Sequence, residues 1–258
     1  MDFLSLSWEY LLITLCGGFL SGFIDSIAGG GGLISLPVFL AMGMPPHYAI
    51  GTNKFAATFG SGISTVQFMR AGKVDGGLMK KLVPFTFIGA VLGCLLMLHM
   101  SAAMLQPLVI AALVAVAIFV FSRRDLGSVS TYTGETKKKL IQGAAFAFVI
   151  GVYDGFIGPG TGTFLIIAFA MLGFDFVVAA GNAKVLNFVS NLTAFCLFIY
   201  SGKVLYAYGL TMALGIFIGA FFGSRMAIRR GSGFVRLIMM TVTTLLIGKL
   251  ILQYFGLF

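Results

Sequence analysis

Long apolar runs alternate with short polar connections along the whole chain of 258 residues. Most of these runs are close to the ~20 residues that a helix needs to cross the hydrocarbon core of a bilayer. Two runs, 10–44 and 139–173, are too long for one straight crossing, and each is interrupted by a glycine-rich stretch. The pattern predicts an all-α polytopic membrane protein. The apolar runs cover approximately residues 10–44, 47–69, 77–98, 102–122, 139–173, 176–200, 204–224 and 234–256.

The first half of the pattern recurs in the second half. Asp25, a glycine-rich break, Lys54 and a Gly-Lys-Val triplet follow one another in the first half, and Asp154, a second break, Lys184 and the same triplet follow in the second. The aspartates are 129 positions apart and the lysines 130, so one residue has been inserted between them. The duplication predicts two transmembrane repeats, which is the organisation of many secondary transporters. We assign the repeats to residues 1–122 and 139–258, and a cytoplasmic linker to 123–138.

The composition supports the membrane class. Hydrophobic residues make up 59% of the chain, charged residues only 10%, and the mean hydropathy is +1.04. Water-soluble domains carry about 25% charged residues, so a soluble core does not explain these values. The cysteines Cys16, Cys94 and Cys196 lie inside apolar runs and predict no disulfide framework. Asp2 and Glu9, with no basic region before the first run, indicate that no cleavable signal peptide is present.

The net charge of +9 is concentrated in three connections between apolar runs. Such clustering is typical of the cytoplasmic loops of membrane proteins, and it requires no nucleic acid as a partner. The clusters contain 13 of the 17 basic residues: Arg70, Lys73, Lys80 and Lys81; Arg123, Arg124, Lys137, Lys138 and Lys139; and Arg225, Arg229, Arg230 and Arg236.

This charge distribution favours one topology. If runs 10–44 and 139–173 each crossed once, eight crossings would result, the halves would be parallel, and the third basic cluster would face the opposite side from the other two. If each run enters, breaks at its glycines and leaves by the same face, the halves are inverted and all three clusters share one side. The second arrangement leaves only Lys203 in an outside loop and agrees with the positive-inside bias. We therefore predict two inverted repeats, each a broken re-entrant helical hairpin plus three transmembrane helices, with both termini outside.

The glycine-rich breaks are candidates for binding an anion. An unwound stretch inside a membrane is tolerated only where protein or a wet cavity satisfies its backbone groups. Half-helices that begin near Leu33 and Thr163 would direct free N–H groups and positive dipole ends toward the interior. Alternatively, the glycines serve only close helix packing. The candidate binding residues at the breaks are Gly31, Gly32, Gly160, Thr161 and Gly162.

Four charged residues lie deep inside apolar runs. Lys54 and Lys184 each lie about eight residues into a helix, or roughly 12 Å from opposite membrane faces, and Asp25 and Asp154 stand beside the breaks. Charges at this depth are costly and mark functional sites in membrane proteins. One interpretation has the lysines bind substrate oxygens in a shared cavity, while the aspartates cap backbone or carry a coupling proton. The other interpretation pairs aspartates with lysines as structural bridges.

Polar residues accompany both lysines along their helices. Thr52, Asn53 and Ser61 belong to the first of these helices, and Asn187 and Asn191 lie three and seven positions after Lys184 on one face of the second. Their hydroxyl and amide groups are candidates for donating hydrogen bonds to an oxyanion. Hydrogen bonds between helices are an equally good explanation of each residue taken alone.

No pattern for catalysis, metal binding or a cofactor appears. His47 and His99 are isolated at the ends of predicted helices, and no phosphate-binding GxxxxGK[ST] motif is present. The chain is therefore predicted to be neither an enzyme nor a cofactor-binding protein.

Several of these motifs together resemble a known family. The motifs are Gly-Phe-Ile-Asp-Ser at 22–26 with Ala-Gly-Gly-Gly-Gly at 28–32, Thr-Asn-Lys at 52–54, Tyr-Asp-Gly-Phe-Ile-Gly-Pro-Gly at 153–160, and Ala-Lys-Val-Leu-Asn at 183–187. Over nearly its whole length the chain resembles the TauE/SafE family of sulfite and organosulfonate exporters, and most closely its YfcA-like bacterial inner-membrane members. The resemblance implies a transporter for anions of sulfur metabolism, such as sulfite, sulfoacetate, taurine-related sulfonates or thiosulfate. The cysteine-centred motif of the separate thiosulfate-uptake transporters is not seen, which disfavours thiosulfate.

These observations lead to one expected function and two alternatives. The expected function is secondary transport of a small anion across the bacterial inner membrane by alternating access, in a monomer or a homodimer. An anion channel is the first alternative. A non-transporting membrane scaffold, in which the Asp–Lys pairs are structural, is the second.

Overall fold

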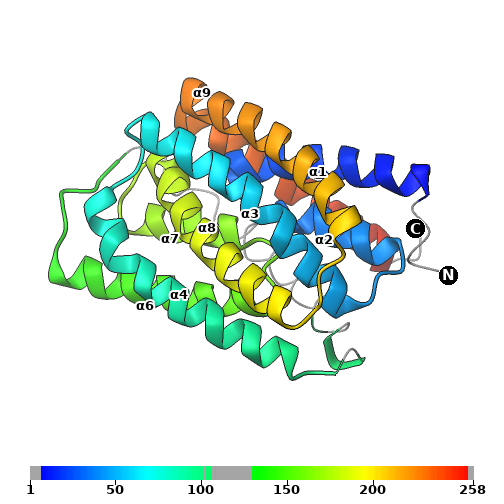
Figure 1. The fold of residues 1–258 in the computed structure, drawn as a ribbon. Coiled ribbons are helices and arrows are strands. Elements are labelled where there is room, and N and C mark those ends of the chain that lie inside the picture. Colours follow the sequence, from blue (N-terminus) through cyan, green and yellow to red (C-terminus); the bar gives the residue numbers. More distant parts are fainter. Residues whose placement is uncertain (1–6, 102, 106–107, 109–129, 255–258) are drawn as a thin grey trace.

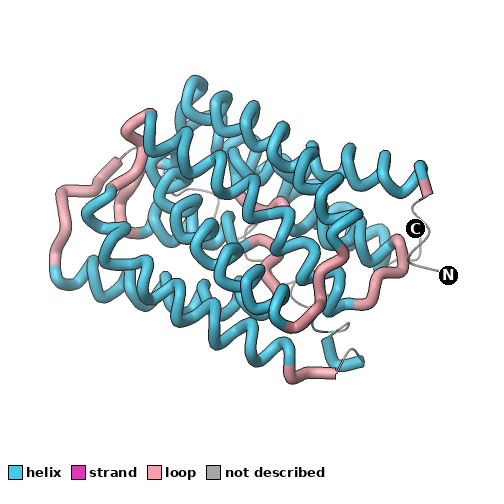
Figure 2. The backbone as a smooth tube through the Cα atoms, viewed as in Figure 1, coloured by secondary structure: helices cyan, strands magenta, loops and turns pink. Residues whose placement is uncertain are grey.

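Every secondary-structure element in the described part of the chain is a helix (Figures 1 and 2). The computed structural model describes residues 7–101, 103–105, 108 and 130–254, so most of the predicted run 102–122 lies outside the described residues. The helix α9 contains a non-helical residue, Gly231, and is two predicted runs joined end to end. The helices are α1 (Trp8–Ala28), α2 (Gly32–Ala41), α3 (Pro46–Arg70), α4 (Gly76–Leu98), α6 (Lys137–Phe156), α7 (Thr161–Met171), α8 (Phe176–Tyr200) and α9 (Tyr206–Tyr254).

Five of the described helices are long and apolar enough to cross a membrane: α1, α4, α6, α8 and the segment Tyr206–Thr241 of α9. The helices α2 and α7 are apolar but have only 10 and 11 residues. Long helices of this composition indicate a multi-pass membrane protein. The helix α3 has the required length of 25 residues but is more polar than these five, because it carries Thr52, Asn53 and Lys54 in succession.

Local sequence signals fix the ends of these helices. The side chain of Asp75 accepts a hydrogen bond from the backbone N–H of Leu78 at 3.0 Å and caps α4. Asp175 caps α8 in the same way, accepting from the N–H of Val177 at 2.9 Å. Such caps satisfy backbone donors that have no partner within the helix. Pro46 opens α3 at a position where its missing N–H costs nothing.

Glycine makes the break between α1 and α2. Gly29 and Gly30 have φ values of 75° and 89°, which side chains with a Cβ rarely adopt. After the break the chain turns back, because Gly31 lies against Ser21 while Val38 contacts Gly17 near the middle of α1. The helix α2 therefore runs antiparallel along the second half of α1.

A matching hairpin joins α6 and α7. Its break contains glycines with φ values of 93° (Gly158) and 81° (Gly160). The Tyr153 hydroxyl of α6 donates to the backbone oxygen of Pro159 at 2.6 Å, which fixes the break against the helix before it. In both hairpins the first arm is about twice as long as the second, with 21 and 20 residues against 10 and 11.

The two halves make the same contacts with each other in both directions. Gly51 packs on the carbonyl of Lys203, and Gly181, 130 positions later, packs on the carbonyl of Lys73. In the same way, Thr52 accepts a hydrogen bond from the N–H of Leu205 at 3.0 Å, and Asn182 accepts one from the N–H of Asp75 at 2.8 Å. Contacts that repeat with their partners exchanged are those of a two-fold arrangement.

The helices α3 and α8 run antiparallel at the centre of this arrangement. Gly51 near the start of α3 meets Phe198 near the end of α8, and Phe68 near the end of α3 meets Gly181 near the start of α8. Outside this pair, α1 packs along α9 and α6 packs along α4, so each broken hairpin is held by a helix of the other half (Figure 1).

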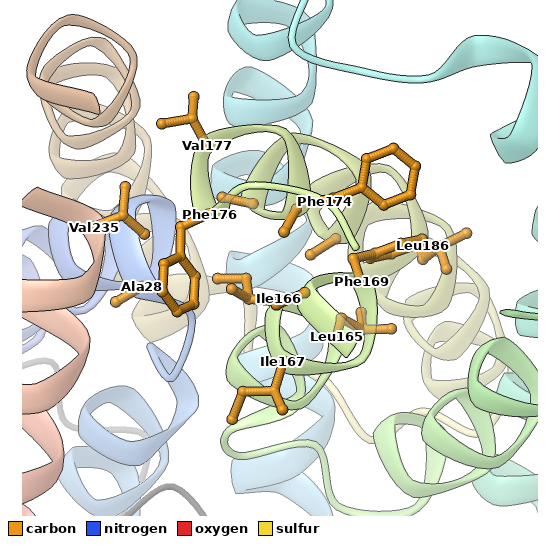
Figure 3. Packing of buried hydrophobic residues seen from close by; sticks show 14 of the residues in the cluster. Ala28, Leu165, Ile166, Ile167, Phe169, Phe174, Phe176, Val177, Leu186 and Val235 are labelled. Carbon is orange, nitrogen blue, oxygen red and sulfur yellow. The ribbon is translucent and has the colours of Figure 1, made fainter. Parts of the chain in front are cut away.

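Two apolar cores lie toward opposite ends of the central helices: one contains Phe68 of α3 and Phe176 of α8, the other Ile50 of α3 and Phe198 of α8. One surrounds α7 and includes Leu165, Ile166, Phe169 and Phe176 (Figure 3). The other surrounds α2 and includes Leu36 and several other fully buried side chains. Each short arm is thus buried on most sides, which positions its amino-terminal end between the two cores.

The outward faces of the long helices carry large apolar side chains. This surface suits lipid rather than water, because an apolar patch of such extent is rare on soluble proteins. Examples on α4 and α9 are Phe87, Ile88, Leu96, Leu210, Leu214 and Phe222.

The basic clusters within the described residues gather at one end of the molecule. Lys81 at the start of α4 forms an ion pair of 2.6 Å with Glu135, just before the lysines of α6. Ser232, at the break in α9, donates to Asp175 at the start of α8 at 3.0 Å. These contacts bring the second half of α9 and the starts of α4, α6 and α8 together, whereas α1 begins and α9 ends at the opposite end (Figure 1). Arg123 and Arg124 lie outside the described residues.

The described part of the predicted linker is docked on the second half. The N–H of Thr131 donates to the carbonyl of Gly173 at 2.8 Å, and the ring of Tyr132 stacks on Phe174 with 3.9 Å between ring centroids. Burial, together with nearby Asp75 and Glu135, raises the pKa of Tyr132. The described end of the linker is therefore an ordered strap over the turn between α7 and α8.

Candidate functional site

A small polar cavity lies where both hairpin breaks meet α3 and α8. Its volume of about 30 Å³ is room for one or two water molecules. The walls come from α1, α2, α3, α6, α7, α8 and α9, so both halves of the chain contribute. The lining residues are Ser21, Asp25, Gly30, Gly31, Gly32, Ser35, Asn53, Lys54, Ala57, Asp154, Gly158, Gly160, Thr161, Gly162, Asn187, Asn191 and Ile216.

Lys54 of α3 contributes an ammonium group to the wall of this cavity. Its Nζ donates to Asp154 Oδ1 at 2.6 Å and to Asn191 Oδ1 at 3.2 Å. The side chains of Lys54 and Asp154 are both only 1% exposed. A buried pair such as this is stable only while both charges are present, since either one alone would be left uncompensated.

Asp154 accepts hydrogen bonds from several side chains in addition to its ion-pair partner. Besides Lys54, Thr161 donates to Oδ1 at 2.9 Å, Asn187 donates to Oδ2 at 3.2 Å, and Ser190 makes a short hydrogen bond to Oδ2. Four side chains from three helices therefore donate hydrogen bonds to this one carboxylate.

Lys184 and Asp25 form the second ion pair. Lys184 Nζ donates to Asp25 Oδ2 at 2.6 Å, and the other carboxylate oxygen accepts from the N–H of Gly31 at 3.1 Å. Lys184 is fully buried, while the side chain of Asp25 is 22% exposed. Asp25 lines the cavity, and Lys184 lies behind it.

The two ion pairs cross between the halves of the chain. Lys54 of the first half bonds Asp154 of the second, and Lys184 of the second half bonds Asp25 of the first. The sequence is compatible both with lysines that pair with aspartates and with lysines that face a cavity. In the structure both lysines are paired, and Lys54 in addition lines the cavity.

The amino-terminal ends of the short arms face the aspartates. Gly31 at the start of α2 donates its N–H to Asp25, and Thr161 at the start of α7 donates its hydroxyl to Asp154. The positive dipole ends predicted to face a substrate anion are therefore directed at carboxylates of the protein. The half-helices begin at Gly32 and Thr161, one and two residues before the predicted Leu33 and Thr163.

Asn53 offers a hydrogen-bond donor to the cavity. Its Oδ1 accepts from the Ser35 hydroxyl at 2.6 Å, which directs the amide nitrogen the other way. Among the described residues, the side-chain hydrogen bond of Asn53 is the one that its oxygen accepts from Ser35, and the nitrogen makes none. Together with Lys54, it is suited to bind an oxygen of an anion.

Most of the binding residues predicted from sequence line this cavity, and three do not. Lys184 stands behind Asp25. The Thr52 hydroxyl accepts from the N–H of Leu205 and secures the connection to α9, and the Ser61 hydroxyl donates to the carbonyl of Ala57 within its own helix. The predicted residues that do line the cavity are Asp25, Gly31, Gly32, Asn53, Lys54, Asp154, Gly160, Thr161, Gly162, Asn187 and Asn191.

Sequence reasoning missed several residues of the site. Ser35 lies one turn into α2, four positions after Gly31, and Ser190 lies three positions after Asn187 on the polar face of α8. Both positions follow from helical spacing once the helix starts are known. Ser21 and Ile216 gave no comparable signal, because each faces the cavity only through the packing of α1 on α9.

No group of three or more His, Cys, Asp or Glu side chains that could hold a metal ion occurs in the part of the chain that the structure describes.

Comparison with known proteins places this arrangement among membrane transporters. A family model described as sulfite exporter TauE/SafE matches residues 14–250. A probable membrane transporter protein, ORF9, from a Sinorhizobium species is 37% identical over 250 residues, which are 95% of this chain and 94% of the relative. The probable membrane transporter protein YfcA of Escherichia coli is 36% identical over 242 residues, 92% of this chain and 88% of its own. A probable membrane transporter protein of Haemophilus influenzae is 34% identical over 248 residues, 94% and 95% of the two chains. No solved structure matches the chain.

Proposed function

This chain belongs to the TauE/SafE family of membrane transporters, and from that premise we propose that it carries a small sulfur oxyanion across the bacterial inner membrane. Sulfite or an organosulfonate such as sulfoacetate is the proposed substrate. The description of the matching family as a sulfite exporter supports this substrate class. As a secondary transporter the protein would need no cofactor.

One observation carries the proposal: a buried ammonium group lines a polar cavity formed by both halves of the chain. Lys54 and the amide of Asn53 both face this space. Charge-assisted hydrogen bonds from such groups are the strongest that a protein offers to an oxyanion. Because the cavity has room for only one or two waters, binding an anion requires the halves to move apart or a side chain to be displaced.

Alternating access follows from the position of the cavity. The tips of the two hairpins touch there, with Gly29 of the first against Gly162 and Thr163 of the second. A tilt of one half against the other would open the cavity toward one end of the molecule and close it toward the other. The closed space at this junction supports a carrier over a channel, which needs a continuous path.

We propose that the two halves are inverted repeats with the basic end in the cytoplasm. The antiparallel course of α3 and α8, whose contacts are exchanged between the halves, supports inversion. The gathering of the described basic clusters at one end supports the orientation.

This topology predicts the accessibility of single cysteines in a variant that lacks the three native ones. Cysteine at Thr133, exposed in the linker, should react with an impermeant thiol reagent only from the cytoplasmic side. Cysteine at Tyr200, which is 93% exposed at the end of α8, should react only from the periplasmic side. Tags at both termini should be periplasmic as well. A cytoplasmic amino-terminal tag would contradict the inverted arrangement.

The experiment that tests the function is flux of radiolabelled sulfite into proteoliposomes. The wild-type protein should show saturable flux, and Lys54→Ala should lower it about 10- to 100-fold, as expected when a charged hydrogen-bond donor is lost. Lys203→Ala is the matched control, because Lys203 lies outside the cavity with its Nζ 4.9 Å from the centre of the Tyr48 ring.

Three results would contradict parts of this proposal. Unchanged flux in folded Lys54→Ala protein would leave the lysine a structural role only. Unitary currents in planar bilayers would indicate the channel alternative. If neither sulfite nor sulfoacetate moves, the oxyanion transport proposed here is wrong, and a non-transporting scaffold becomes the better explanation.

A further inference from the structure

We propose that Asp25 binds and releases a proton during transport, so that each monovalent anion crosses together with one proton. The proposal rests on the proposed transport function and deepens it. The two aspartates are equivalent by sequence, but their surroundings in the structure differ in three respects: hydrogen-bond donors, exposure and neighbouring charge.

The two carboxylates differ in the number of hydrogen-bond donors that they contact. Asp154 accepts hydrogen bonds from four side chains, namely Lys54, Thr161, Asn187 and Ser190. Within the described part of the chain, Asp25 accepts from Lys184 and from one backbone N–H. Each donor stabilises the ionised form, so protonating Asp154 would cost several hydrogen bonds that Asp25 never had.

The sequences of α3 and α8, the helices that carry Lys54 and Lys184, explain this difference. Asn187 and Ser190 of α8 bond Asp154, whereas the corresponding positions of α3, 130 residues earlier, are Ala57 and Gly60. Neither alanine nor glycine has a side-chain donor. The first repeat therefore cannot build around Asp25 the set of donors that the second repeat builds around Asp154.

The two carboxylates also differ in the exposed fraction of their side chains. Asp25 is 22% exposed and Asp154 is 1% exposed, although both line the cavity. The charged groups that face Asp25 are Lys184 from α8 and, across the cavity, Lys54 from α3 with Asp154 from α6. The parts of α2, α7 and α9 that line the cavity contribute no titratable side chain. A proton from cavity water can therefore reach Asp25.

Charge balance favours an event of this kind. Two lysines and two aspartates sum to zero before the anion arrives, so a bound anion would leave one excess negative charge inside the membrane. Protonation of Asp25 restores the sum to zero for a monovalent anion. The ammonium of Lys184 then has the bound anion as its negative neighbour, in place of the Asp25 carboxylate. Lys184 is close enough for this role, since its Nζ lies 3.5 Å from the position of a Cβ on Gly162, a residue that lines the cavity.

The cycle conserves protons and charge at every step. On the loading side the Asp25 carboxylate takes one proton from water, and the anion binds near Lys54 and Lys184. After the halves have moved, the anion leaves, the Asp25 carboxylic acid returns its proton to water, and the Lys184–Asp25 ion pair forms again. One anion and one proton have crossed, and no net charge has moved.

The wild-type protein provides the first test. Proteoliposomes that contain a pH-sensitive dye receive an inward gradient of isethionate, a monovalent sulfonate with no volatile acid form, and of sulfite in a parallel series. Saturable anion entry should acidify the lumen by one proton per anion, and a potassium diffusion potential should leave the rate unchanged. Anion entry without acidification, or entry driven by the potential, would overturn proton coupling while leaving anion transport established. Absence of saturable entry for both anions would overturn the transport function itself, and the proposal with it.

Variants provide the second test. In the range where Asp25 is mostly ionised, linkage of one proton to one anion should change the apparent anion affinity about tenfold per pH unit, stronger at lower pH. Asp25→Asn should remove this pH dependence and the luminal acidification, and Asp25→Glu should keep both. Glu135→Gln is the matched control, because the carboxylate of Glu135 in the linker pairs with Lys81 of α4, away from the cavity. This variant should behave as wild type. Retained pH dependence in Asp25→Asn would overturn the assignment. If Asp25→Asn does not fold, the Asp25→Glu variant and the wild-type stoichiometry decide the question.

Discussion

Asp154→Ala is expected to lower the free energy of unfolding by about 3–5 kcal/mol and to abolish transport. The substitution leaves Lys54 buried with 1% of its side chain exposed and without its counter-ion. It also removes the acceptor shared by Thr161, Asn187 and Ser190. The measurement is denaturant unfolding of the purified protein in micelles, alongside sulfite flux in proteoliposomes.

A double-mutant cycle separates charge from packing in this prediction. Lys54→Met combined with Asp154→Leu removes both charges and keeps similar volumes, so it should recover a large part of the lost stability without restoring flux. Asp25→Ala should cost about 1–3 kcal/mol less than Asp154→Ala, because fewer donors lose their acceptor. Equal losses for the two alanine variants would show that the extra hydrogen bonds around Asp154 contribute nothing measurable.

Gly29→Ala is expected to have the second largest effect, a loss of at least about 3 kcal/mol accompanied by loss of flux. Gly29 has φ 75° and ψ 178°, a conformation that is essentially restricted to glycine. A Cβ there would also lie 2.1 Å from the backbone nitrogen of Thr163, so one hairpin tip would have to move away from the other. Because backbone rather than a flexible side chain is in the way, the cavity wall itself would shift.

Gly72→Ala is the control for this substitution. Gly72 also has a positive φ of 65°, but a Cβ at this position would meet nothing within 4 Å. Its substitution should cost only about 1–2 kcal/mol for the left-handed backbone. If Gly29→Ala is no worse than Gly72→Ala, the contact between the hairpin tips does not hold the cavity together.

The helical elements were largely predictable because their signals are local. Apolar runs and the glycine breaks predicted the ends of most described helices to within a few residues. The main difference is α9, in which two predicted runs continue across Gly231 as one element.

The candidate site was predictable in its residues but not in its pairing. Spacing placed Lys54, Asn187 and Asn191 on inward faces, and they line the cavity. Spacing could not show that Thr52 lies outside the cavity, because residues on one face of a helix contact different neighbours at different positions along its axis. Which aspartate meets which lysine depends on how the halves pack, and the crossed pairs of the structure follow from contacts of high sequence separation that no local pattern encodes.

The crossed ion pairs also impose an order on biosynthesis. The ribosome completes Asp25 and Lys54 long before Lys184 and Asp154 exist, so the first half enters the membrane without the residues that finally neutralise its buried charges. The nascent first half therefore cannot reach its final state alone. Maturation of the protein is completed only when the second half has been inserted, and a chain truncated between the halves keeps Asp25 and Lys54 without the partners that they have in the full structure.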